Sequence, residues 1–127
     1  MKLLPIAILA AASLAACSPP RAMDYADAGA TALAIANGAT EANPVVGFAG
    51  DAAAPVVALV AKVAVRSIID AADITEPERK QAHHVMDATG AFAACNNIAA
   101  ATSAAPNVSI PIGILCGVIY YSYAGPQ

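Results

Sequence analysis

The chain is poor in the residue types that soluble domains use to face water and to bind flat ligands. Of its 127 residues only 12% are charged and 5% are aromatic, and tryptophan is absent. Soluble domains usually carry about 25% charged residues. The formal net charge is −3, which argues against nucleic acid because phosphate binding needs clustered Lys and Arg. The low aromatic content also weakens any case for a surface that stacks bases or other flat ligands.

Motifs of catalysis are missing as well. The sequence has no nucleophile elbow, no phosphate-cradling glycine loop and no base at a recognisable spacing from a nucleophile. His83, His84 and Asp87 are the one cluster of potential ligands, but a structural zinc site needs four. We therefore expect no enzyme, no metal site and no cofactor, and we interpret this cluster as the exposed polar start of a helix.

Charge is absent from the last third of the chain. Residues 88–127 contain no charged residue and no histidine, whereas charges gather in residues 66–87. The uncharged stretch is long enough for two membrane spans of about 20 residues each, and we expect residues 66–87 to form a water-exposed connection. A cluster of tyrosines near the end is typical of a membrane boundary, or else belongs to the core or rim of a soluble bundle: Tyr120, Tyr121 and Tyr123.

The beginning of the chain has the layout of a secretory signal. Lys2 precedes a short apolar run, and small residues lead to Cys17. The sequence Leu14-Ala15-Ala16-Cys17 resembles a bacterial lipobox. The resemblance implies that Cys17 carries a diacylglyceryl group and, after cleavage before it, a further acyl chain on its amine. Ser18 in place of Asp implies transport to the outer membrane. The alternatives are an ordinary signal peptide or an uncleaved first helix that contains a cysteine.

The pattern predicts an all-α protein: a small bundle of three or four hydrophobic helices, membrane-embedded. We expect a signal peptide at residues 1–16, a lipidated extended tether at 17–23 and one helical domain at 24–127. The predicted helices are 24–37, 44–72 with a break between 50 and 55, 76–104 and 109–123. Asp24 is the predicted N-cap of the first, Gly38 follows its end, and Pro44 starts the second. Thr75 and Glu78 form a capping box.

One polar stripe runs along the second predicted helix at helical spacing: Lys62, Arg66, Asp70 and Asp73. It is either an interfacial face from which Lys62 reaches water, or Lys62 points into the bundle and pairs with Asp27 or Glu41. Asp27, Glu41 and Lys62 are therefore our candidates for an intramembrane polar network.

The motif Asp27…Thr31…Gly38-x-x-Glu41-x-Asn43-Pro44 resembles a family of small bacterial and phage membrane proteins of unknown function. The resemblance implies a compact bundle of hydrophobic helices, in which Lys62 matches a lysine of the second helix. Asn96 or Asn97 would match an asparagine of the third. The lipobox in front of this motif departs from the pattern of that family.

Two cysteines remain after Cys17 is assigned to lipid. Cys95 and Cys116 are either a disulfide in an oxidising compartment or free thiols packed as small hydrophobic residues, and we expect free thiols. Gly113 and Gly117 lie four residues apart and permit close contact between helices.

These observations predict a small membrane-associated lipoprotein with a structural or accessory role in the cell envelope, lipid as its partner and self-association through helices. The alternative is a lipid-anchored periplasmic bundle that binds an envelope protein, for example a phage-encoded exclusion protein. Spanning helices would place it in the inner membrane, and a lipid anchor alone would place it on the periplasmic face of the outer membrane.

Overall fold

The computed structural model describes residues 19–40, 44–102 and 105–127, and all regular structure in these ranges is helical. The predicted all-α class is confirmed. Five helices are described: α2 (Ala22–Ala36), α3 (Pro44–Gly47), α4 (Ala54–Ala71), α5 (Glu76–Ala101) and α6 (Pro106–Tyr123). The predicted signal peptide, the lipobox with Cys17, and Ser18 lie outside the described ranges, as do Glu41 and Asn43.

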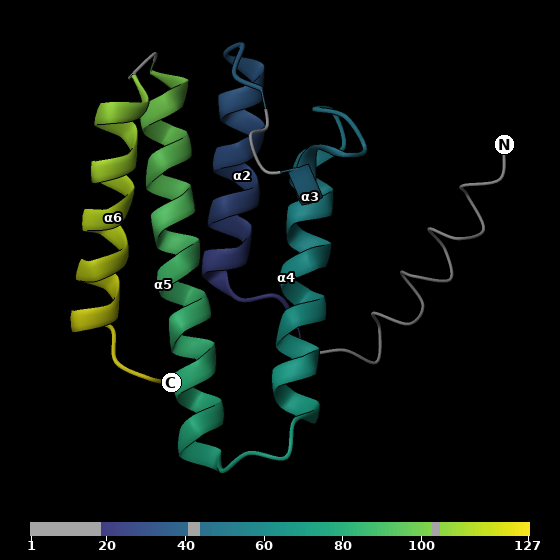
Figure 1. Cartoon of the computed structure of the whole chain (residues 1–127), viewed down its shortest axis with the longest axis vertical. Helices are drawn as coiled ribbons and strands as arrows, with labels where there is room; N and C mark the ends of the chain where they lie inside the picture. Colours follow the sequence, from purple (N-terminus) through teal and green to yellow (C-terminus); the bar gives the residue numbers. More distant parts are fainter. Residues whose placement is uncertain (1–18, 41–43, 103–104) are drawn as a thin grey trace, which may run out of the picture.

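The four long helices lie side by side in the order α6, α5, α2, α4 (Figure 1). The main contacts join neighbours in this row, and α4 touches α5 only slightly. The short α3 packs against α4, where Val46, Ala54 and Ala58 form a small apolar cluster. As a result, α4 and α6 occupy the two edges, and each has a broad outer face.

Local sequence signals set most helix boundaries. At the start of α5 the Thr75 backbone N–H donates to Glu78 Oε2 at 2.8 Å, which confirms the predicted capping box. Pro44 is the first residue of α3, as predicted. Gly38 and Gly50 have φ values of 89° and 88°, a left-handed conformation that glycine adopts without strain. Gly50 lies in the break between α3 and α4, so the predicted interruption is also confirmed.

The first helix begins earlier than predicted. Asp24 is not its N-cap but its third residue, and its carboxylate accepts the Arg21 backbone N–H at 2.8 Å. The cap prediction was wrong because an acidic side chain can close the first turn from inside the helix as well as from its edge. Ala22 and Met23 therefore belong to α2 rather than to the predicted tether. The last helix also starts earlier, at Pro106, where a proline fits the first turn.

The buried apolar residues are small. Among the residues whose burial is described, most are alanines, and only Val46 and Val63 are larger. Such residues let backbones approach closely. A Cβ added at Gly113 would lie 2.8 Å from the Phe92 carbonyl oxygen, and one added at Gly90 would lie 3.0 Å from that of Met23. The Gly113-x-x-x-Gly117 face thus packs α6 against α5 within the chain.

Within the three described ranges, no helix is both long and apolar enough to cross a membrane. The two spans predicted for residues 88–127 are therefore not supported.

Candidate functional site: a charged interior

The centre of the bundle contains a fully buried arginine. Arg66 of α4 has no exposed surface and reaches both α2 and α5. Its Nε and Nη2 donate to Asp24 Oδ2 and Oδ1 at 2.7 and 2.8 Å. Its Nη2 also donates to Asp87 Oδ1 at 2.5 Å. The planar guanidinium fits two carboxylates in this way because its N–H groups form a rigid fork.

A second arginine completes the charge balance. Arg21 Nη1 lies 3.3 Å from Asp87 Oδ2, so two arginines face two aspartates. Burial raises the pKa of Asp24, but hydrogen bonds from Arg66 and from the Arg21 backbone outweigh it and the pKa is lowered overall. Burial lowers the pKa of Arg66, and the hydrogen bonds to Asp24 and Asp87 raise it overall. Both shifts favour the charged forms of Asp24 and Arg66.

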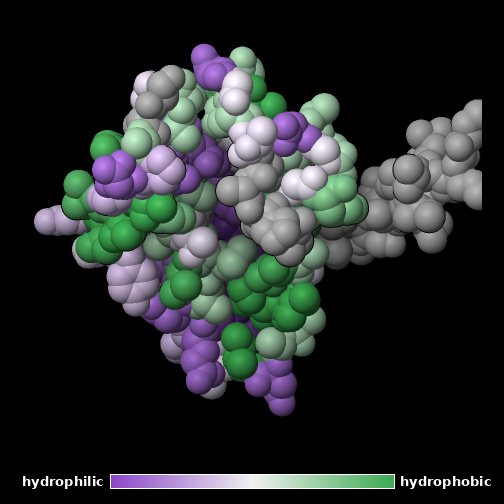
Figure 2. Space-filling model, turned by 45° about the horizontal axis from the view of Figure 1, so that its top comes forward, coloured by the Kyte–Doolittle hydropathy of each residue, from purple (hydrophilic) through white to green (hydrophobic). Residues whose placement is uncertain are grey.

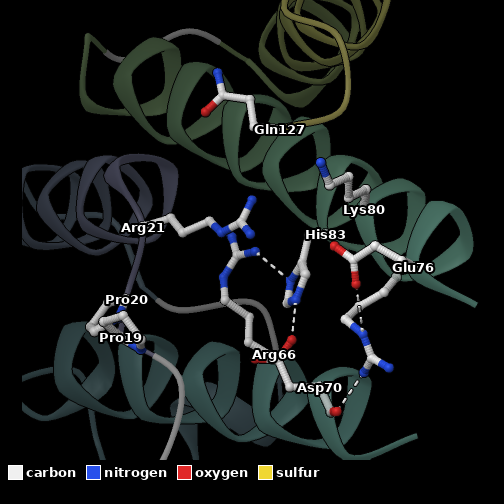
Figure 3. A pocket seen from close by; sticks show the side chains of 10 residues that line it. Pro19, Pro20, Arg21, Arg66, Asp70, Glu76, Lys80, His83 and Gln127 are labelled. Carbon is white, nitrogen blue, oxygen red and sulfur yellow. Dashed lines mark hydrogen bonds and ion pairs between the residues drawn. The ribbon is translucent and has the colours of Figure 1, made fainter. Parts of the chain in front are cut away.

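His83 extends the network towards solvent. Its Nδ1 lies 3.2 Å from Arg66 Nη1, and its Nε2 lies 2.6 Å from Asp70 Oδ1 (Figure 3). Because arginine can only donate, Nδ1 accepts and Nε2–H donates to Asp70. His84 Nε2 lies 2.8 Å from the Tyr121 carbonyl oxygen and donates to it, and its ring stacks on that of Tyr121.

These contacts correct two expectations. Residues 66–87 are not simply a water-exposed connection, and the His83–His84–Asp87 cluster is not an exposed helix start, since all three side chains are buried. The reason is that Lys62 and Arg66 of the polar stripe turn towards α2 and α5 instead of towards solvent. Among the described residues, no group of three or more His, Cys, Asp or Glu side chains could hold a metal ion.

A second, smaller polar cluster lies one turn along α4. Lys62 Nζ lies 2.6 Å from Asp27 Oδ2 and forms an ion pair with it. Asn97 Nδ2 donates to Thr31 Oγ1 at 2.8 Å and more weakly to Asp27 Oδ1 at 3.4 Å. Of the three candidates for the polar network, the structure thus brings Asp27 and Lys62 together. The Lys62 side chain points into the bundle.

The Arg66 network was not predicted. The polar stripe on α4 was the available signal, but helical spacing indicates only which side chains of one helix lie near each other. The observed carboxylate partners of Arg66 lie on α2 and α5, and nothing in the pattern shows which helices meet.

The outer surface has the opposite character. The side of α4 that faces away from the bundle carries Val56, Val60 and Ile68, which are 64%, 39% and 68% exposed. The exposed side chains of α6 are also large and apolar: Ile110, Ile112, Ile114, Leu115, Val118 and Ile119. Figure 2 shows apolar side chains on both flanks of a hollow whose depth is hydrophilic. The bundle thus buries ion-paired charged groups, while its two edge helices expose large apolar side chains.

A disulfide joins the two last helices. Cys95 of α5 and Cys116 of α6 are bonded, with their Cα atoms 6.4 Å apart. The expectation of free thiols was wrong, because the close approach of α5 and α6 brings the two side chains within bonding distance.

A small open pocket of about 290 Å³ lies beside His83 (Figure 3). Four basic and two acidic residues are part of its lining: Arg21, Arg66, Arg79, Lys80, Asp70 and Glu76. Arg66 is bound by Asp24 and Asp87, and Arg79 lies 3.5 Å from Glu76. The pocket therefore offers no concentrated positive charge for an anion.

Comparison with known proteins identifies no family for the chain, since no family model, no curated protein and no solved structure matches it. The class that the structure defines is an all-α bundle with a charged interior.

Proposed function

We propose that this protein is an exported, lipid-anchored protein of the cell envelope, with a structural or accessory and non-catalytic role. In this proposal the outer faces of α4 and α6 contact the membrane. One observation carries it: a set of ion-paired charged side chains lies inside the described bundle, and the exposed faces of its two edge helices carry large apolar side chains.

A protein surrounded by water usually has the reverse arrangement, with charged side chains exposed and large apolar side chains buried. Large exposed apolar patches on soluble proteins usually mark contact with a membrane or another protein. Ionisable side chains in a membrane environment face the interior of a bundle and pair with one another. Lys62 with Asp27 and Arg66 with Asp24 and Asp87 are paired in this manner.

The position of Cys17 supports the same proposal. The first described residue is Pro19, and Arg21 already bonds to the buried network through Asp87. Four residues span at most roughly 14 Å. Acyl chains on Cys17 would therefore hold the bundle directly at the membrane surface, where its apolar flanks can enter the lipid. By the lipobox resemblance, Ser18 favours the outer membrane.

The Cys95–Cys116 disulfide favours an oxidising compartment, since structural disulfides are rare in the cytosol. It also keeps open the second candidate function, a lipid-anchored periplasmic bundle that binds an envelope protein. In that case the same faces of α4 and α6 would contact the partner instead of lipid.

The lipid anchor is tested by growing producing cells with an alkyne-bearing palmitate and detecting incorporation into the purified protein. We expect label on the wild type, none on Cys17→Ser, and full labelling of Cys95→Ser. A wild-type chain that takes up no label would refute the anchor.

A further inference from the structure

His83 stands between the buried arginine network and the small open pocket. Its side chain is 6% exposed and lies between two side chains of α4, those of Arg66 and Asp70 (Figure 3). Its Nδ1 lies 3.2 Å from Arg66 Nη1, and its Nε2 lies 2.6 Å from Asp70 Oδ1. Because His83 belongs to α5, its ring connects α4 with α5, two helices that otherwise touch only slightly.

The contact with Arg66 requires a neutral imidazole. A guanidinium group can only donate, so Nδ1 accepts this hydrogen bond only while it carries no proton. After protonation, two cationic donors would face each other at 3.2 Å away from water. Arg66 has no room to withdraw, because Asp24 and Asp87 hold it by hydrogen bonds of 2.5–2.8 Å. A protonated ring must therefore leave Arg66.

The charges around the ring are already balanced. Six charged residues line the pocket together with His83, and Asp24 and Asp87 bind Arg66. The α2 segment contributes one of each sign, as does α4, and α5 contributes two of each sign. These residues are Arg21 and Asp24, Arg66 and Asp70, and Arg79, Lys80, Glu76 and Asp87. No charged side chain follows residue 87, so a proton on His83 would add an uncompensated positive charge.

The pocket gives the ring a place to go. It has a volume of about 290 Å³, it is open to solvent, and its lining includes the carboxylates of Asp70 and Glu76. An imidazolium that turns into it keeps a carboxylate partner and moves away from Arg66. Arg66 Nη1 then loses its imidazole acceptor in a buried position, which is unfavourable. The contact of α4 with the bundle becomes weaker as a result.

We propose that His83 is a pH-sensitive switch for the α4 contact. Near neutral pH the uncharged ring accepts from Arg66 and donates to Asp70. In weakly acidic solution the ring takes up a proton from solvent and turns into the pocket, and α4 loosens. Histidine is suited to this task because its charge ordinarily changes between about pH 5 and pH 8. The switch does not depend on the membrane role, since all of its contacts lie within the chain.

Amide hydrogen exchange of the full chain in detergent micelles tests the switch at about pH 7.5 and about pH 5.5, with each rate divided by the intrinsic rate at that pH. We expect the protection of α4 to fall roughly tenfold at the lower pH, since one linked proton changes an opening equilibrium by at most about tenfold per pH unit. Protection of α6 should stay unchanged, because a disulfide holds that helix. NMR of the ring nitrogens should show a neutral His83 with its proton on Nε2 at the higher pH.

The two histidines of the chain provide a variant and its matched control. His83→Gln keeps an acceptor for Arg66 and a donor for Asp70 but does not titrate, so the protection of its α4 should not depend on pH. His84→Gln should respond as the wild type does, because His84 contacts Tyr121 of α6. A response that persists in His83→Gln, or that His84→Gln removes, would overturn the proposal.

The wild type decides alone if His83→Gln does not fold. Protonation of the His83 ring, followed by NMR, should occur over the same pH range as the loss of protection in α4. A ring that is already charged at about pH 7.5, or α4 protection that stays constant while the ring is protonated, would also overturn the proposal.

Discussion

The two edge helices, α4 and α6, are held to the bundle by opposite kinds of contact. The long charged side chains of Arg66 and Lys62 reach from α4 to carboxylates on its neighbours. In contrast, α6 lies directly on α5, where Gly113 and Gly117 face Phe92 and a disulfide joins the helices. The α4 contact therefore depends on ionisation, and the α6 contact depends on shape and on oxidation state. Both leave an apolar outer face.

The largest expected effect is at the α4 contact. Arg66→Met leaves Asp24 and Asp87 buried without their shared cation, and removing one partner of a buried ion pair costs about 3–5 kcal/mol. Denaturant unfolding in micelles would measure the loss of free energy. Lys80→Met is the matched control, because Lys80 is exposed and should change stability by less than about 0.5 kcal/mol. Equal losses in the two variants would show that the network does not hold α4.

The next effect is at the α6 contact. The disulfide closes a sequence separation of 21 residues, and such a bond typically contributes about 2–4 kcal/mol. We expect a reductant, or Cys116→Ser, to lower the free energy of unfolding by this amount. Amide hydrogen exchange should rise in α6 and stay unchanged in α4. Unaltered exchange in α6 after reduction would contradict this assignment.

A pair of glycines tests the shape of the same contact. In Gly113→Ala the added methyl would meet the Phe92 carbonyl oxygen at 2.8 Å, and we expect a loss of about 1–3 kcal/mol from overpacking. Gly29 is also helical, but nothing lies within 4 Å of an added Cβ. Gly29→Ala should therefore stabilise the protein by up to about 1 kcal/mol. Thermal unfolding of both variants compares them, and losses of the same size would exclude a close α5–α6 contact at Gly113.

The smallest effect concerns pH. Because the folded-state pKa of Asp24 is lowered from its ordinary value of 3.8, its contribution to stability is complete above that value. The contribution is lost as the pH falls through the folded pKa. We expect the free energy of unfolding of Asp24→Asn to fall less steeply below pH 5 than that of the wild type. The exposed Asp73→Asn control should keep the pH dependence of the wild type. Identical slopes would mean that Asp24 is not held ionised.

The helices could be predicted from the sequence because their signals are local. The Thr75–Glu78 capping box, the glycines at 38 and 50 and the proline at 44 act within a few residues of their own position. The partners of Arg66 could not be predicted in this way. They lie 42 and 21 residues away, and the contact depends on how α2, α4 and α5 meet.

The Cys95–Cys116 bond has a similar explanation. The sequence allowed either a disulfide or two packed thiols, and only the close α5–α6 contact at Gly113 selects the bond. For Asp27 and Lys62 the pattern offered the pair as one of two alternatives, whereas Asn97 was suggested by family resemblance alone.

The central claim is that the apolar faces of α4 and α6 contact lipid. The most direct test is a chain that begins at Ser18 behind a cleavable signal without the cysteine, followed by cell fractionation and carbonate washing. We predict that this chain remains with the membrane although it has no acyl anchor. Its recovery as a soluble periplasmic protein would contradict the claim and leave the anchor at Cys17 as the only attachment.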